Sequence, residues 1–241
     1  MLKLIRVLLL MFVVSPANAQ ELHTGDTLPA GLQLHDLKTG QPITTASLKG
    51  KAVIIDCWAT WCAPCIEGMK DLESWQQQFK DNLVVLAVSG ERPDRLKQFM
   101  KNRPGAVKII SDTAGIVSTL FPHRTIPHTV LIGTDGRVKA ITAAENVSTK
   151  LVQQLIAGQP VDLPLKKDKL EFDLAAYFNS DTSLSRQFNI QPGVEGQPSF
   201  SKTYPNTAFD QRRITIVNGT MRLLYQIAYR KSFFRMADEY N

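Results

Sequence analysis

Two cysteines three positions apart, Cys62 and Cys65, lie where the sequence pattern changes from strand to helix. The apolar, largely β-branched residues 52–55 before them are typical of a buried strand. After Cys65 apolar residues recur at steps of three and four, which predicts an amphipathic helix; they are Ile66, Met69, Leu72, Trp75 and Phe79. A helix N-terminus carries partial positive charge and free N–H groups, which favour a thiolate. A dithiol in this setting predicts a redox couple.

A structural disulfide and half of a zinc site are the alternative uses of this pair. A zinc site needs two further ligands, and the nearest candidates are His123 and His128, with Cys57 on the preceding strand. All three cysteines fall between Cys57 and Cys65, whereas a disulfide-stapled scaffold has more of them at scattered spacings. The redox interpretation is therefore favoured, and we expect no metal and no cofactor.

Residues 1–19 have the pattern of a secretory signal peptide. Lys3 and Arg6 precede the apolar run 7–14, and residues 17–19 form a small-x-small cleavage site. A membrane anchor is the alternative, but the apolar run is short for one. The residue directly after the cleavage site is Gln20 and not a cysteine, which argues against lipid attachment there. We expect an exported, periplasmic protein that is soluble and does not span the membrane once the signal is removed.

The charge of the chain is mild. The formal net charge of +6 loses two cations with the signal peptide and falls to +4. The short basic clusters Lys166-Lys167 and Arg212-Arg213 are expected to be solvated. Because no basic stripe with interleaved aromatic residues is present, we do not expect a nucleic-acid partner.

Strand and helix patterns alternate along residues 20–158, which predicts one α/β domain. A loop-rich lead-in contains a predicted hairpin over 32–37 and 41–45. Further strands are predicted at 53–58, 83–88, 107–110, 129–132 and 138–142, and helices at 62–79, 93–102, 115–121 and 151–157, with Ser148 as the N-cap of the last.

Two sequence motifs within this series of strands and helices resemble those of a known family. D-x-W-A-T-W-C-x-P-C occupies residues 56–65, and T-I-P-H-T-V-L-I occupies residues 125–132. The chain resembles the thioredoxin superfamily, and within it the TlpA-like exported thiol–disulfide reductases, over about residues 25–158. The resemblance implies a thioredoxin-like fold, a central mixed β-sheet flanked by helices. It also implies that Ile126-Pro127 is a cis peptide bond lying against the two cysteines, a placed feature because trans is otherwise preferred.

The order of the two thiols along the helix suggests different roles. Cys62 precedes the helix and is expected to be the exposed nucleophile that forms a mixed disulfide with substrate. Cys65 lies one turn inside and is expected to resolve that mixed disulfide. Pro64 stiffens the loop at no hydrogen-bonding cost, because first-turn N–H groups have no helical partner. Trp61 is expected to pack beside the site, either as a shield or as an apolar platform for partners.

Asp56 ends an otherwise apolar strand, where a carboxylate is costly unless solvated or paired. The resemblance implies a buried acid that takes a proton from the resolving cysteine, with a pKa raised toward neutrality by burial. An aspartate that reaches solvent or a cap is the alternative. Cys57 is expected to be a small core residue, with an auxiliary redox role as the alternative. His128 could approach the thiols, although a plain surface or core histidine is favoured.

Ala63 supplies no cation between the cysteines, which favours a reductant over a strong oxidant. The predicted activity is reduction of protein disulfides, and an exported reductant needs a membrane-bound dithiol as electron donor. A thiol peroxidase is one alternative, but it needs a threonine where Ala59 stands. A non-catalytic redox-sensing or binding module is the other. Gly68 and Lys70 replace an acid and a proline that many TlpA-like proteins have.

Residues 159–171 resemble a linker, and residues 172–241 are predicted to form a small α+β extension of unknown function, an incomplete or very small domain. Its predicted elements are a helix at 172–178, a loop at 191–205, a strand at 213–217 and a helix at 220–229 with Met221, Leu224, Ile227 and Ala228 facing inward.

Overall fold

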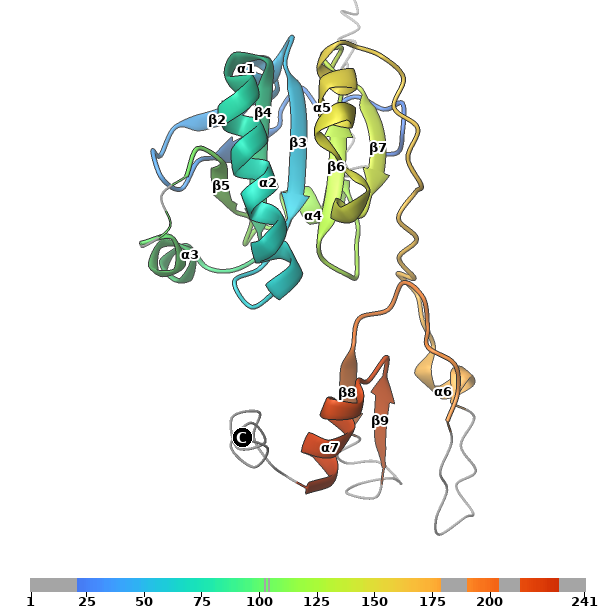
Figure 1. Ribbon diagram of the computed structural model, residues 1–241. Helices are drawn as coiled ribbons and strands as arrows, with labels where there is room; N and C mark the ends of the chain where they lie inside the picture. Colours follow the sequence, from blue (N-terminus) through green and yellow to red (C-terminus); the bar gives the residue numbers. More distant parts are fainter. Residues whose placement is uncertain (1–20, 102, 104, 179–189, 204–212, 230–241) are drawn as a thin grey trace, which may run out of the picture.

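The computed structural model describes residues 21–101, 103, 105–178, 190–203 and 213–229 (Figure 1). The predicted signal peptide therefore lies outside the described residues. Apart from a short helix at residues 45–48 that was not predicted, the strands and helices of the first domain follow one another in the predicted order. The strands of the first domain are β1 (Gln33–His35), β2 (Pro42–Thr44), β3 (Ala52–Cys57), β4 (Leu83–Ser89), β5 (Lys108–Ser111), β6 (His128–Ile132) and β7 (Val138–Thr142). The helices are α1 (Thr45–Leu48), α2 (Ala63–Phe79), α3 (Pro93–Met100), α4 (Ile116–Leu120) and α5 (Thr149–Ile156), with short 3-10 turns at Lys80–Asn82 and Ala144–Asn146.

A five-stranded mixed sheet forms the centre of the domain, in the order β5-β4-β3-β6-β7. β3, β4 and β5 run parallel, and β6 and β7 run antiparallel to their neighbours. Every residue of β3 and β4 is buried, as expected for parallel strands covered on both faces. The predicted central mixed sheet flanked by helices is therefore confirmed.

Alternate side chains of β3 point into two separate cores. Val53, Ile55 and Cys57 pack with α4 and the N-terminal segment. Ala52 and Ile54 pack on the other face, where α2, α3 and α5 contribute apolar side chains. Figure 1 shows α2 and α5 in front of the sheet and α4 behind it. Since side chains alternate along a strand, Asp56 shares the α2 face and Cys57 the opposite one.

The predicted boundaries hold to within a few residues. β1 and β2 form the predicted antiparallel hairpin. The β6–β7 hairpin turns through Gly136, whose φ of 77° favours glycine. The Ser148 hydroxyl accepts a hydrogen bond from the Leu151 N–H, which confirms it as the N-cap of α5.

Residues 159–171, the predicted linker, run along the domain. Val161 and Leu163 pack against the core on the α2 face. The Thr142 hydroxyl donates to the Pro164 carbonyl at 2.8 Å, and the Lys166 N–H donates to the Ile141 carbonyl at 3.0 Å. The prediction that Lys166 is a solvated residue is wrong, because its side chain is only 11% exposed.

The C-terminal unit contains α6 (Leu174–Tyr177), the antiparallel pair β8 (Phe200–Thr203) and β9 (Ile214–Val217), and α7 (Met221–Tyr229), below the first domain in Figure 1. The prediction of a loop over residues 191–205 is wrong for residues 200–203, which form β8. The Phe-Ser-Lys-Thr sequence has no apolar alternation, and the strand exists through its backbone pairing with β9.

The predicted inward face of α7 is also wrong in part. Met221 and Leu224 are exposed, whereas Leu223 and Ile227 are half-buried. Leu223 lies over the turn that follows β9, so the helix is rotated relative to the predicted face. The orientation of Ala228 lies outside the described side chains.

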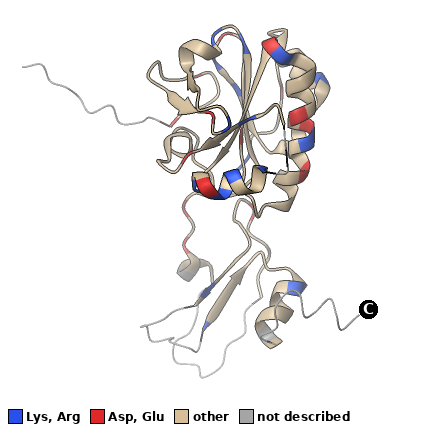
Figure 2. Ribbon diagram, turned by 90° about the vertical axis from the view of Figure 1, so that its left-hand side faces the viewer, with Lys and Arg blue, Asp and Glu red and all other residues tan. Residues whose placement is uncertain are grey.

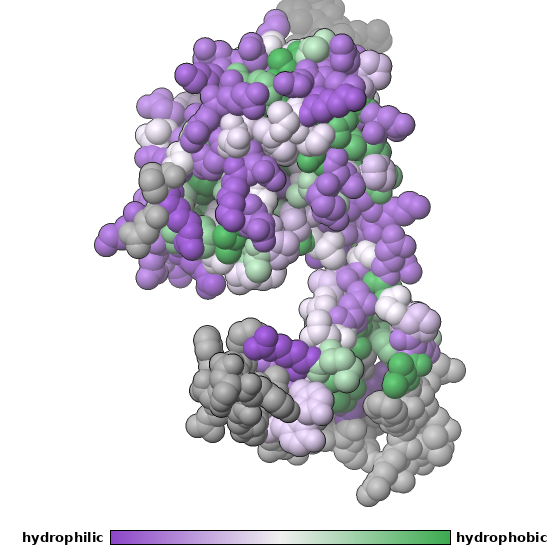
Figure 3. Space-filling model, in the orientation of Figure 1, coloured by the Kyte–Doolittle hydropathy of each residue, from purple (hydrophilic) through white to green (hydrophobic). Residues whose placement is uncertain are grey.

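Charges of both signs alternate along the helices on the side of the domain drawn in Figure 2. Polar side chains cover most of the face in Figure 3, interrupted by small apolar patches. Among the described helices, none is both long and apolar enough to cross a membrane.

Candidate active site

Cys62 and Cys65 form a disulfide at the N-terminus of α2. Cys62 is the N-cap residue, and its Sγ accepts a hydrogen bond from the Cys65 N–H at 3.3 Å. Pro64 occupies the first turn, where a missing N–H costs no helical hydrogen bond. The position of the pair follows from the buried strand β3, which delivers the chain to one edge of the sheet, and from the amphipathic helix that starts there. In the reduced form the same free N–H groups would stabilise a Cys62 thiolate.

Cys62 is less accessible than the sequence predicts. Cys62 is 5% exposed and Cys65 is 1% exposed, so the expected exposure of Cys62 is wrong for this disulfide form. The reason is the loop before β6, which covers the pair: Cys62 Sγ lies 3.9 Å from the Ile126 carbonyl oxygen. Cys62 remains the more accessible of the two.

Ile126–Pro127 is a cis peptide bond, as the resemblance implies. Ile126 packs against both cores, and Pro127 lines a cavity together with Cys65. The segment therefore forms a wall beside the disulfide.

Asp56 is buried at the end of β3 and faces the same cavity, of about 590 Å³, as Cys65 and Pro64. Its carboxylate accepts a hydrogen bond from the Thr129 hydroxyl at 2.7 Å. Burial raises the pKa of Asp56 from 3.8 to about 7, against smaller lowering effects from the Thr129 hydrogen bond and the charge of Lys166. A carboxyl group that titrates near neutrality and lines the same cavity as Cys65 is suited to exchange a proton with that thiol.

Gly68 lines this cavity too, and a Cβ placed there would meet no atom within 4 Å. Glycine at this position, where many TlpA-like proteins have an acid, therefore leaves open space in the cavity that Asp56 also lines.

Comparison with known proteins agrees with this geometry. A family model described as AhpC/TSA matches residues 24–141. This part of the chain is therefore similar to the AhpC/TSA family, and its fold is thioredoxin-like. The thioredoxin-like protein YneN of Bacillus subtilis is 29% identical over 125 residues, which cover 49% of this chain and 73% of YneN.

Further relatives agree with the thioredoxin-like assignment. ResA of Bacillus subtilis, named a thiol-disulfide oxidoreductase, is 32% identical over 106 residues that cover 43% of this chain and 59% of ResA. The chain thus spans less than two thirds of ResA. A solved structure from Chlorobium tepidum, provisionally named thiol:disulfide interchange protein DsbE, is 26% identical, has a TM-score of 0.50, and covers 57% of this chain and 98% of its own. The dithiol of the thioredoxin-like domain is of the thiol–disulfide oxidoreductase type.

Among the described residues, neither Cys57 nor His128 is bonded to Cys62 or Cys65. They are cross-strand neighbours on β3 and β6. Cys57 is buried on the opposite face of the sheet from Asp56, and burial raises the pKa of its thiol. The His128 ring stacks on His123 with 4.5 Å between centroids, and burial lowers its pKa to about 3. Both residues are thus neutral near pH 7.

Trp61 is 69% exposed beside the disulfide, which places an apolar surface where a partner can reach it. It borders a second cavity of about 300 Å³, together with Trp58, Gly90 and Ile126. Among the described residues, no group of three or more His, Cys, Asp or Glu is arranged to hold a metal ion.

Sequence analysis missed Thr129 and Glu91. Glu91 accepts hydrogen bonds from the Thr60 N–H at 2.7 Å and the Thr60 hydroxyl at 2.8 Å, which holds the loop before Cys62. Glu91 follows β4, and the carboxyl ends of the parallel strands β3 and β4 lie side by side. This arrangement could have indicated that Glu91 lies near the loop before Cys62. Thr129 lies opposite Asp56 only because of the antiparallel register, which one sequence does not reveal.

Proposed function

We propose that this chain is an exported thiol–disulfide oxidoreductase that reduces protein disulfides with Cys62 and Cys65. The observation that carries the proposal is the Cys62–Cys65 pair at the start of α2, with the buried Asp56 carboxyl lining the same cavity as Cys65. The names of ResA and the Chlorobium tepidum protein support the same reaction class.

The reaction starts from the reduced dithiol. The Cys62 thiolate attacks one sulfur of a substrate disulfide, and the other substrate sulfur leaves and takes up a proton. Asp56, as carboxylate, then accepts the Cys65 proton, and the Cys65 thiolate attacks Cys62 Sγ. The second substrate thiol is released, and the protein retains the Cys62–Cys65 disulfide. The substrate gains two electrons, which the dithiol loses.

The residues around the dithiol have supporting roles in this scheme. Trp61 offers an apolar platform to the incoming protein, and Pro64 limits the motion of the loop between the cysteines. Ile126 and Pro127 form the wall against which the substrate lies next to Cys62. No cofactor takes part in these steps, and a membrane-bound dithiol donor reduces the disulfide again.

The cellular setting is part of the proposal. Residues 1–19 act as a signal peptide that is cleaved before Gln20, and the mature protein works as a soluble periplasmic protein. Residues 20–158 form the catalytic domain, residues 159–171 connect it, and residues 172–241 form the C-terminal extension.

Insulin reduction and peroxide consumption, measured on the same sample, test this function. With dithiothreitol as donor, the protein should reduce insulin, and its peroxide consumption should not exceed that of the Cys62→Ser variant. A thiol peroxidase would show the reverse, and Ala59 in place of the required threonine argues against it. Failure in both assays would favour a non-catalytic binding module.

The redox potential should be nearer that of thioredoxin, about −270 mV, than that of a strong oxidant, about −120 mV. Ala63 gives the Cys62 thiolate no neighbouring cation, so the reduced form is less stabilised and the disulfide is more stable. Glu67 adds little, because it is exposed and lies 3.8 Å from Lys70. Equilibration with glutathione measures the potential, and Ala63→His should raise it. A value near −120 mV (about that of the oxidant) would instead indicate a disulfide donor.

A further inference from the structure

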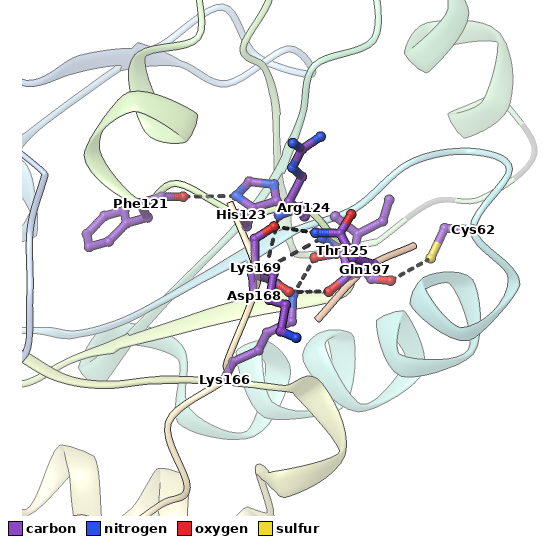
Figure 4. Close-up of polar contacts among 10 residues, drawn as sticks. Cys62, Phe121, His123, Arg124, Thr125, Lys166, Asp168, Lys169 and Gln197 are labelled. Carbon is purple, nitrogen blue, oxygen red and sulfur yellow. Dashed lines mark hydrogen bonds and ion pairs between the residues drawn. The ribbon is translucent and has the colours of Figure 1, made fainter. Parts of the chain in front are cut away.

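A segment beyond the family match closes over the loop that precedes β6. The family match ends at residue 141, and this strap, defined as residues 164–170, follows it. It is fastened to the end of β7 by the hydrogen bonds from Thr142 and Lys166 described above. From there it crosses to the loop of residues 124–127, which contains the cis-proline (Figure 4).

Asp168 holds that loop through backbone and side-chain donors. Its side chain is only 6% exposed. Its carboxylate accepts hydrogen bonds from the Arg124 N–H at 3.0 Å, the Thr125 hydroxyl at 2.6 Å and the Thr125 N–H at 3.5 Å. The Arg124 guanidinium donates in return to the Leu170 carbonyl at 3.1 and 2.8 Å. The loop and the strap are thus joined in both directions.

Lys166 completes the contact. Its Nζ donates to the Thr125 carbonyl and lies 3.1 Å from Asp168 Oδ2. Removing both charges of such a pair from water is expensive, and a well-packed apolar pair of similar size is often as stable. Stability alone therefore gives no strong reason for a charged pair here. Its location gives one, since Thr125 directly precedes Ile126, whose carbonyl lies against Cys62.

We propose that Lys166 and Asp168 are positioning residues of the redox site: through their hydrogen bonds to Arg124 and Thr125 they fix the cis-proline loop against Cys62. This inference rests on the proposed function, because it assigns the strap to the machinery of the same dithiol. On this proposal, the segment that connects the first domain to the C-terminal unit contributes to the redox site.

The charges around Lys166 come from several elements. Burial lowers the pKa of Lys166, while Asp168 on the strap and Glu145 before α5 favour its protonated form. Its charge also acts on Asp56 and Cys57 of β3 and on the stacked His123 and His128. Of these groups, Asp56 has a pKa near neutrality, and the Lys166 charge opposes the rise that burial causes.

The strap also contacts the C-terminal unit. The Lys169 N–H donates to the Gly196 carbonyl at 3.0 Å, and the Gln197 amide donates to the Lys169 carbonyl. Gly196 has a φ of 77°, and a Cβ there would lie 2.3 Å from the Lys167 carbonyl oxygen, so this close approach requires glycine. The strap is therefore held between the redox site and the extension.

Titration of the Asp56 carboxyl in the full-length disulfide form reports whether the Lys166 ammonium is held where its charge reaches the redox site, because neither Cys62 nor Cys65 titrates in that form. The ¹³C NMR signal of this carboxyl is assigned by its loss in Asp56→Asn. In Lys166→Met the midpoint should move up, because the substitution removes a charge that lowers the pKa of Asp56. Lys167→Met removes an exposed charge from the same strap and should leave the midpoint unchanged. Lys166→Arg should keep it near the parent value.

A midpoint that is the same in Lys166→Met and the parent, or that moves equally in Lys167→Met, would overturn the role of Lys166. If Lys166→Met does not fold, Lys166→Gln keeps an N–H donor for Thr125 and gives the same comparison. For Asp168→Ala, amide hydrogen exchange at Arg124 and Thr125 should accelerate at least about tenfold more than in the exposed control Asp162→Ala, and equal exchange would overturn its role. These readouts need no enzymatic activity, so failure of insulin reduction would count against the proposed function alone.

Discussion

Cys62→Ser should lower the rate of insulin reduction to the uncatalysed background. Cys65→Ser should instead produce a protein that captures its substrates covalently. Cys62 caps α2 and is the more accessible of the two cysteine residues, so it is the one expected to meet a substrate disulfide. Cys65 lies inside the first turn and faces the Asp56 cavity. Without Cys65 the mixed disulfide on Cys62 has no internal thiol to resolve it.

Mass spectrometry of Cys65→Ser after exposure to oxidised protein substrates locates these adducts. The matched control is Cys57→Ser, which should retain insulin reduction, because Cys57 is buried on the opposite face of the sheet. Adducts found mainly on Cys57 would contradict the division of labour between Cys62 and Cys65. Adducts on Cys62 would in addition identify the physiological substrates.

The core of this domain was predictable because local pattern and global fold agree there. The apolar runs of β3 and β4 are buried on both faces, so they have no competing polar face that could shift their assignment. The dithiol position followed from the same junction of strand and helix. The charged residue in an apolar strand marked Asp56 as unusual, because a carboxylate there is costly without a special environment. Its burial was implied only by the family resemblance, since the pattern alone also allowed an aspartate that reaches solvent.

The features that sequence analysis missed depend on long-range contacts. Lys166 was predicted to be solvated and Asp168 lies in the predicted linker, but both side chains are buried where this segment meets the distant cis-proline loop. β8 exists through pairing with β9 across intervening residues. The small C-terminal unit has few buried apolar side chains among its described residues, so its local patterns constrain the fold weakly.

Asp56→Asn should stabilise the disulfide form at pH 8 by up to about 4 kcal/mol, and the gain should vanish by about pH 4. Burial raises the pKa of Asp56 from 3.8 to about 7 in the folded protein. Between those values the folded state retains a proton that the unfolded state has lost, so the stability of the parent falls as pH rises. Asparagine carries no such proton, and its side-chain oxygen can still accept the Thr129 hydrogen bond.

Urea unfolding of the parent and Asp56→Asn at pH 4 and pH 8 measures this difference. Asp162→Asn changes an exposed aspartate and controls for net charge. An equal stability difference at both pH values would mean that Asp56 is not protonated by burial.

Asp56→Asn should also slow catalysis while it stabilises the folded protein. The amide that replaces the carboxyl group in Asp56→Asn cannot accept the Cys65 proton, so resolution of the mixed disulfide loses its internal base. The turnover of the parent should rise through about pH 7, following ionisation of Asp56, and this rise should be absent in Asp56→Asn. Insulin reduction measured from about pH 6 to 9, the interval around the expected thiol titrations, tests it. Unchanged turnover with increased stability would show that the buried carboxyl costs stability without serving the reaction. Slower turnover with increased stability would show that the domain retains a destabilising group because the resolving thiol needs it.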